Sequence, residues 1–101
     1  MRHSDIQQWL RRGIAQRLGR APETLGLMVT FDEYGIDSLE AVNFTCEIEN
    51  FIGHRIEPAT LWDHRTVWEL SVHLAETLGL QVDYPEDEAE LDALLHALAS
   101  K

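Results

Sequence analysis

The chain has 101 residues, 45% hydrophobic and 8% aromatic, which is enough for one domain with a modest core. Eighteen acidic against eight basic residues give a formal net charge of −10, which argues against nucleic acid or an anionic membrane as partner and favours basic protein surfaces. The single cysteine, Cys46, cannot form an internal disulfide, and no N-terminal apolar run has signal-peptide or membrane length. We therefore expect a cytoplasmic monomer.

The first predicted element is an amphipathic helix from Ser4 to Leu18. Ser4 and Gln7 have the spacing of a capping box, in which the first residue and the third residue after it satisfy free backbone donors. Gly19 is expected to end this helix. Apolar residues recur between these ends at near-helical spacing: Ile6, Trp9, Leu10, Ile14 and Leu18.

The next segment, residues 21–36, shows no clear periodicity. It nevertheless keeps several apolar residues, namely Leu25, Leu27, Val29, Phe31 and Tyr34. A connection of this length is unusual inside a small domain. Because it is partly apolar, we expect it to pack back on the helices and not to move freely in solvent.

The residues from Gly35 to Val42 mark the start of a second helix. Asp37 can act as its N-cap with Glu40 three residues on, a variant of the capping box. Gly35 supplies the conformational freedom for a sharp turn before the helix. Ser38 in the first turn then has an exposed hydroxyl near the positive end of the helix dipole, where a phosphate ester is well placed. On this local chemistry alone, the serine can equally be a simple helix cap.

Two apolar stripes run along this helix, which is predicted to extend from Ser38 to Ile52 and to end at Gly53. At 100° per residue, one stripe is assigned to the core: Ala41, Phe44, Thr45, Ile48 and Ile52. The other lies on the side of Ser38 and has acidic neighbours: Leu39, Val42 and Cys46, flanked by Asp37, Glu40, Glu47 and Glu49. This second stripe suits a transient docking surface for basic partners, or else it is buried under the long loop. Both interpretations stay open.

Two further helices are predicted between residues 56 and 79. Pro58 stands near the start of a helix of one or two turns. Thr66 and Glu69 repeat the capping-box spacing and introduce a fourth helix that ends at Gly79. One apolar face accompanies it: Val67, Leu70, Leu74 and Leu78.

The C-terminal part is predicted to consist of a linker, from Leu80 to Pro85, and a short acidic helix that follows it. Its apolar stripe consists of Leu91, Leu94, Leu95 and Leu98. An isolated helix of this length rarely persists in water, so it should dock on something. Residues 1–80 are expected to form the functional domain. Residues 81–101 are expected to be either a docking element or a helix that packs on its own bundle.

Signals of an independent enzyme or a metal site are weak. His54, His64 and His73 lack the close spacing or accompanying cysteines of a zinc site, so we expect surface or interface histidines and no bound metal. The sequence has no G-x-S-x-G motif and no glycine-rich phosphate loop followed by Lys-Ser/Thr. No base is positioned to activate Ser38, so a serine hydrolase has little support.

A resemblance to a known family is carried by two stretches. The pattern Phe31-x-x-Tyr34-Gly35-Ile36-Asp37-Ser38-Leu39 resembles the attachment motif of acyl carrier proteins, whose serine receives a 4′-phosphopantetheine arm. Pro58-Ala59-Thr60-Leu61, Asp63-His64, Thr66-Val67 and His73-Leu74 resemble modular polyketide-synthase carrier domains, although Arg65 replaces the proline often found there. Over residues 4–79, the resemblance implies an all-α four-helix bundle. It would have three longer helices, one short helix, a long loop between the first two, and here an extra C-terminal helix.

The resemblance also implies a function without catalysis of its own. A phosphopantetheinyl transferase would attach the arm from coenzyme A to Ser38, and the thiol of the arm would hold acyl or polyketide intermediates as thioesters. Acyl-loading enzymes, ketosynthases or tailoring enzymes with basic docking surfaces would act on this cargo. Asp37 before Ser38 favours an acyl or polyketide carrier, because peptidyl carriers more often show Gly-Gly-x-Ser. Fatty-acid synthesis is less favoured. A peptidyl carrier and an unmodified acidic interaction module remain alternatives.

Overall fold

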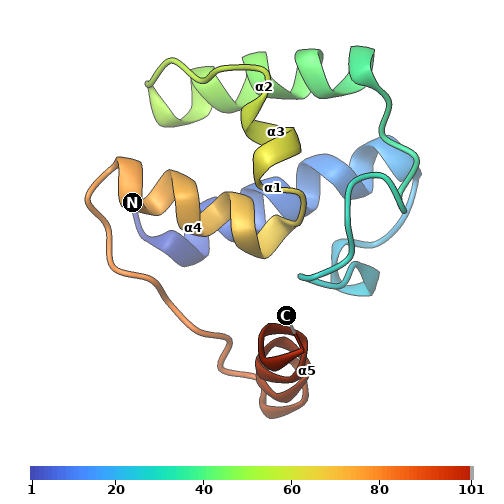
Figure 1. Ribbon diagram of the computed structural model, residues 1–101, viewed down its shortest axis with the longest axis vertical. Helices are drawn as coiled ribbons and strands as arrows, with labels where there is room; N and C mark the ends of the chain where they lie inside the picture. Colours follow the sequence, from blue (N-terminus) through green and yellow to red (C-terminus); the bar gives the residue numbers. More distant parts are fainter. Residues whose placement is uncertain (101) are drawn as a thin grey trace.

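The computed structural model describes residues 1–100, and every regular element in that range is helical. Lys101, the last residue of the predicted C-terminal segment, lies outside the described residues. Figure 1 shows the order of the elements. They are α1 (His3–Leu18), the 3₁₀ helix η1 (Pro22–Thr24), α2 (Ser38–Ile52), α3 (Thr60–Asp63), α4 (Val67–Thr77) and α5 (Glu88–Ala99). The predicted all-α fold with a long loop before α2 is confirmed. No helix within residues 1–100 is both long and apolar enough to cross a membrane.

The start of α1 differs from the prediction. The helix begins at His3, and the backbone N–H of Arg2 donates to the carboxylate of Asp5 at 2.8 Å. The predicted cap at Ser4 is wrong, because Ser4 lies inside the first turn of the helix. Its backbone N–H donates to the carboxylate of Asp83 at 3.1 Å. A charged acceptor from the far end of the chain thus satisfies a donor that the sequence had assigned to a local capping box.

Helix α2 follows its prediction in both its ends and its buried face. It spans Ser38–Ile52, ends at Gly53 with φ +74°, and buries the five residues assigned to the core: Ala41, Phe44, Thr45, Ile48 and Ile52. A stack of aromatic rings joins it to α1. The ring of Trp9 lies 5.9 Å from that of Phe44 and 4.5 Å from that of Phe51, both nearly parallel.

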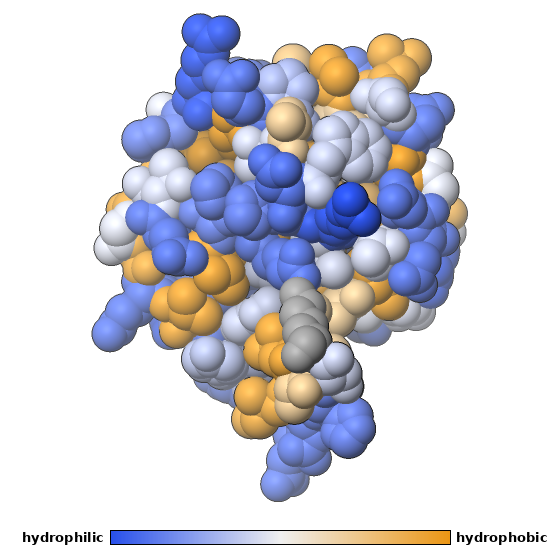
Figure 2. All heavy atoms as spheres, viewed as in Figure 1, coloured by the Kyte–Doolittle hydropathy of each residue, from blue (hydrophilic) through white to orange (hydrophobic). Residues whose placement is uncertain are grey.

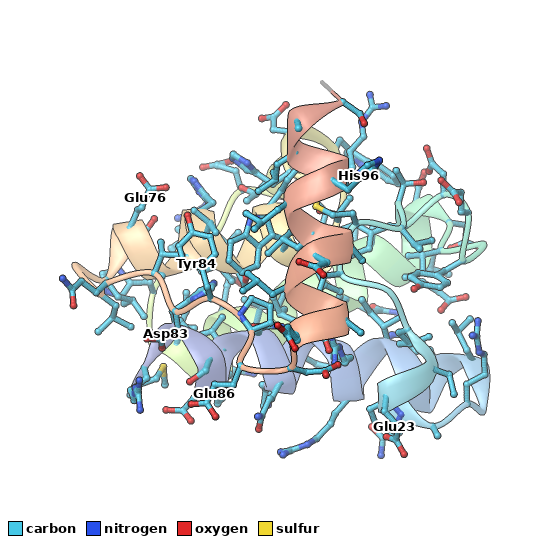
Figure 3. All side chains as sticks on the ribbon, turned by 90° about the horizontal axis from the view of Figure 1, so that it is seen from below. Glu23, Glu76, Asp83, Tyr84, Glu86 and His96 are labelled. Atoms are coloured by element: carbon cyan, nitrogen blue, oxygen red, sulfur yellow. The ribbon has the colours of Figure 1, made fainter. Side chains whose placement is uncertain are left out.

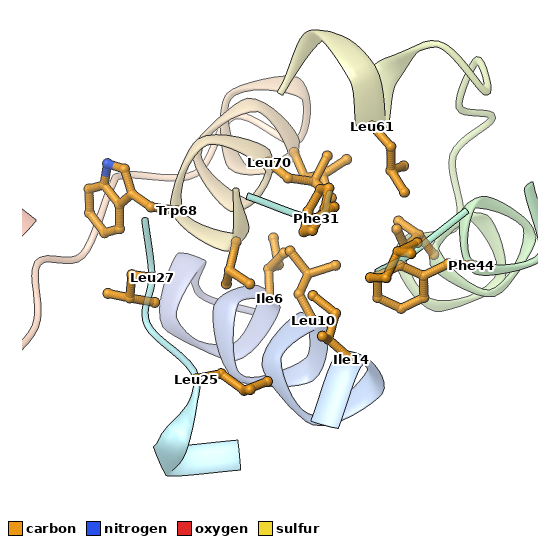
Figure 4. Packing of buried hydrophobic residues seen from close by; sticks show 14 of the residues in the cluster. Ile6, Leu10, Ile14, Leu25, Leu27, Phe31, Phe44, Leu61, Trp68 and Leu70 are labelled. Carbon is orange, nitrogen blue, oxygen red and sulfur yellow. The ribbon is translucent and has the colours of Figure 1, made fainter. Parts of the chain in front are cut away.

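The long loop between α1 and α2 packs on the bundle, as expected. Leu25, Leu27, Phe31 and Ile36 are buried, and Figure 4 shows Leu27 close to Trp68 of α4. Backbone hydrogen bonds hold the loop to the start of α4: Phe31 N–H donates to the Arg65 carbonyl at 2.9 Å, and Trp68 N–H donates to the Leu27 carbonyl at 3.0 Å. The loop therefore forms part of the core and positions the segment that leads into α2.

Helix α5 docks on its own bundle. Leu94 is only 2% exposed, and Glu90 forms an ion pair with Arg11 of α1. Figure 3 shows α5 lying across the bundle, with Asp83 and Tyr84 on the linker beside it. In Figure 1, whose vertical direction is the longest axis of the molecule, α5 and α2 lie at opposite ends. The face of α2 that carries Ser38 is consequently left uncovered by α5.

Candidate functional site

A hydrogen-bonded turn leads into α2 and presents Ser38. Gly35 has φ +77°, a left-handed conformation that strains other residues, and its N–H donates to the Asp32 carbonyl at 3.0 Å. The N–H of Ile36 donates to the Phe31 carbonyl at 3.1 Å. Asp37 then caps the helix, with its Oδ1 accepting from the Glu40 N–H at 2.9 Å. The predicted cap is present, and α2 begins at the residue after it.

The side chain of Ser38 is exposed to solvent in the first turn of α2. Within residues 1–100, its hydroxyl has no hydrogen-bond partner, so no histidine or carboxylate is placed to remove its proton. The positive end of the helix dipole and the free N–H groups of the first turn suit a phosphate ester on this oxygen. Among the described residues, Ser38 therefore lacks the hydrogen-bonded base that activates a catalytic serine.

The second apolar stripe of α2 is exposed, which rules out burial under the loop. Leu39 is 70% exposed and Val42 is 44% exposed, and Cys46 also faces solvent. Figure 2 shows hydrophobic residues at the upper right of the molecule, over one end of α2, and hydrophilic residues at the upper left. The strip and Ser38 share one side of the helix, as the 100° spacing predicted. That this strip docks partners stays a prediction.

Two of the predicted acidic neighbours have partners inside the chain. Glu47 forms an ion pair with Arg17 of α1, whose guanidinium also lies 4.5 Å from the centre of the Phe44 ring. Glu49 accepts a hydrogen bond from the Ile56 N–H at 2.8 Å and holds the segment after α2. Two of the carboxylates predicted to steer partners therefore form contacts within the chain instead. Asp37 remains exposed next to Ser38.

The scattered histidines form one close pair. The rings of His64 and His73 are stacked with centroids 4.1 Å apart. Burial lowers the pKa of His73, and the neighbouring His64 adds to the effect because two positive charges repel. Within residues 1–100, no cluster of three or more His, Cys, Asp or Glu side chains could hold a metal ion. Another histidine, His3, is fully buried, and the sequence pattern did not predict this burial.

The family described as "Phosphopantetheine attachment site" matches residues 8–74 of the chain. Among curated proteins, polyketide synthase ThaG of Burkholderia thailandensis is 36% identical over 77 residues, which is 76% of this chain. The chain spans about 1% of the length of that synthase.

Two solved structures resemble the fold closely. A free-standing peptidyl carrier protein from a secondary metabolic pathway of Acinetobacter baumannii has a TM-score of 0.71 and 27% identity, over 76% of this chain and 96% of its own. Asl1650, an acyl carrier protein from Anabaena sp. PCC 7120 with a variant phosphopantetheinylation site, has a TM-score of 0.72 and 28% identity. That match covers 75% of this chain and 86% of the other.

Proposed function

Because this chain belongs to the family of phosphopantetheine attachment domains, we propose that Ser38 is the residue that receives the 4′-phosphopantetheine arm. One observation carries this proposal: the Ser38 hydroxyl is exposed at the capped start of α2 and has no hydrogen-bond partner in the part of the chain that the structure describes. Asp37, Ser38 and Leu39 also match the attachment motif of acyl carrier proteins, and Ser38 lies inside the matched residues 8–74.

Attachment is a phosphoryl-transfer step in which Ser38 is a substrate of the transferase. Its hydroxyl oxygen forms a bond to the phosphorus that carries pantetheine in coenzyme A, and the bond to the adenosine bisphosphate portion breaks. The hydroxyl proton passes to a base of the transferase, because the described residues place no base at this oxygen. The arm would then supply a terminal thiol that holds an acyl group as a thioester.

The exposed strip of α2 is proposed as the contact surface for the transferase and for the enzymes that use the cargo. Leu39, Val42 and Cys46 would provide apolar contact, and Asp37 and Glu40 would steer basic surfaces. A tethered cargo reaches each partner at high effective concentration, so weak and rapidly released docking is sufficient. We assign the carrier role to residues 1–80 and treat the residues that follow as an extension.

The cargo is proposed to be an acyl or polyketide intermediate. The similarity to polyketide synthase ThaG and the acidic residue before Ser38 support this class. The likeness to a free-standing peptidyl carrier keeps an amino-acyl cargo as the second candidate. Incubating the holo protein with acyl-transferring and with amino-acyl-transferring loading enzymes separates the two, because the intact mass identifies which thioester forms.

The attachment site is tested by labelling. The purified chain is incubated with coenzyme A and a phosphopantetheinyl transferase of broad specificity, and the intact mass should rise by one phosphopantetheinyl group. Ser38→Ala should show no increase, whereas the control Ser100→Ala should be labelled like the wild type. Retention of the mass shift in Ser38→Ala would refute the site. A folded wild type that is never labelled would favour an unmodified interaction module.

A further inference from the structure

A buried histidine joins the C-terminal segment to the bundle. His3 is 0% exposed in the first turn of α1 and lies between α4 and the linker. Its Nε2 is 2.8 Å from the hydroxyl oxygen of Ser71, and its Nδ1 is 2.8 Å from the backbone nitrogen of Asp83. Residues 81–100, which we call the strap, lie beyond the residues 8–74 matched by the family. This connection is therefore a feature outside the matched domain.

The hydrogen bonds require a neutral His3 ring. The Ser71 hydroxyl donates its proton to the Trp68 carbonyl at 2.9 Å, so it must accept from Nε2–H of His3. Nδ1 must then be unprotonated, because it accepts the Asp83 N–H. A proton added to Nδ1 could be shared with the Asp83 carbonyl at 3.1 Å, but the Asp83 N–H would lose its acceptor.

The linker has further contacts beside this histidine. The Asp83 carboxylate accepts from the Ser4 N–H at 3.1 Å and from the guanidinium of Arg2 at 3.2 Å. The ring of Tyr84 lies 5.4 Å from that of Trp68, which in turn meets the His3 ring edge-on at 5.2 Å. Loss of the His3 contact would thus loosen the point where the linker meets both α1 and α4.

Several charges act on the protonation of His3. The Asp83 backbone carbonyl and the Asp83 carboxylate on the linker both favour the protonated ring. Arg2, the residue before α1, forms an ion pair with that carboxylate. Asp5 lies two residues further along α1, and the contacts from α4 come from the uncharged Ser71 and Trp68. Burial outweighs the attraction of Asp83, so the pKa of His3 lies below its ordinary value.

The far end of the strap also meets titratable groups. Leu98 of α5 lines a hollow of about 240 Å³ together with His64, His73, Glu69 and Glu76. Asp63 and Glu76 favour protonation of His73, while His64 and burial oppose it. A test of His3 must therefore separate its effect from that of this pair.

From this geometry we propose that residues 81–100 form a pH-sensitive strap, fastened by neutral His3 and released when that ring gains a proton. The closed strap covers the surface where Leu27 and Trp68 meet. The open strap exposes that surface and the leucines of α5. Helix α2, which begins at Ser38, lies at the opposite end of the longest axis from α5, so the arm would stay accessible in both states.

The sign of the pH effect follows from linkage. A histidine whose folded-state pKa is lowered stabilises the closed state fully above pH about 6.5, its unperturbed value. That stability is lost as the pH falls from 6.5 towards the lowered pKa. The closing equilibrium should therefore decrease by up to about tenfold for each pH unit in this window.

The test uses amide hydrogen exchange of the whole chain, measured residue by residue by NMR between pH 7.5 and 5. Protection factors of α5 amides should fall with pH in the wild type, while those of α2 amides stay constant. In His3→Gln, which keeps an acceptor and a donor but does not titrate, the α5 protection should not depend on pH. His54→Gln, a change of an exposed histidine, should behave as the wild type. In His73→Gln, the protection of α5 amides should still decrease as the pH falls.

Two results would overturn the proposal: α5 protection that is constant in the wild type, or an equal fall with pH in His3→Gln. If His3→Gln also loses protection in α2, it is unfolded, and the ring titration of His3 in the wild type decides. A midpoint of the His3 titration at or above pH 6.5 would refute the proposal. A midpoint below pH 6.5 that coincides with the loss of α5 protection would support it.

Discussion

Leu94→Ala is the sharpest test of how α5 is held, because the chain contains a matched control one residue away. Leu94 is 2% exposed and anchors α5 in the core, whereas Leu95 is 47% exposed on the same helix. Both substitutions remove the same atoms and change helix propensity equally. The difference between them therefore isolates burial.

The magnitude follows from the burial of the side chain. Truncating a fully buried leucine typically costs about 2–5 kcal/mol, from lost transfer free energy plus the cavity that remains. Truncating the exposed Leu95 should cost less than about 0.5 kcal/mol. If α5 detaches while α1 to α4 stay folded, as the strap proposal requires, the loss from Leu94→Ala cannot exceed the free energy of docking α5. A loss of stability below about 2 kcal/mol in Leu94→Ala, less than a buried leucine usually contributes, would then equal the free energy of docking α5.

The assay is urea unfolding followed by circular dichroism, in parallel for the wild type and both variants. Thermal unfolding gives a second measure, since each 1 kcal/mol should lower Tm by about 4–8 °C in a domain of this size. Equal stability of Leu94→Ala and Leu95→Ala, with unchanged protection of α5 amides in both, would refute the anchoring role of Leu94.

Three further changes test other parts of the molecule. Val42→Asp should leave the circular dichroism spectrum unchanged, because this side chain is 44% exposed, but should slow phosphopantetheine transfer; unfolding would place Val42 in the core instead. Asp37→Ala removes the acceptor of the Glu40 N–H and should lower the free energy of unfolding in urea by about 1 kcal/mol, so full stability would contradict the cap. The free energy of unfolding of the wild type should decrease as pH falls below about 6.5, because His3 is buried neutral. In His3→Gln this component should be absent, and an unchanged pH dependence would assign it to other groups.

The part of the fold that the sequence predicted well depends on local signals. The start of α2 follows from the Asp37 cap and the turn at Gly35, and its buried face follows from the 3.6-residue period. The apolar residues of the long loop indicated that it would pack on the helices. Motif and period together also placed Ser38 and the strip of Leu39 and Val42 on one exposed side.

What could not be predicted depends on contacts between residues far apart in the chain. Asp83 accepts the backbone N–H of Ser4, and no residue close to Ser4 in the sequence indicates this contact. The same holds for Arg17, which neutralises Glu47 from another helix. An amphipathic helix such as α5 shows that it needs a partner surface, but its sequence does not identify that surface. Only the packing of Leu94 settles that the surface belongs to the same chain.

The isolated bridge between Thr30 and Thr66 has a consequence for how the molecule folds. It joins the loop before α2 to the N-cap of α4, so α2 and α3 lie within the closed chain segment. Helices form in about a microsecond, whereas a contact between distant residues must first meet the entropy of loop closure. We therefore expect the helices and the local turn at Gly35 to form early, and the packing of the loop against the start of α4 to become ordered late. In a nascent chain, this packing could form only after the residues up to Thr66 have been synthesised.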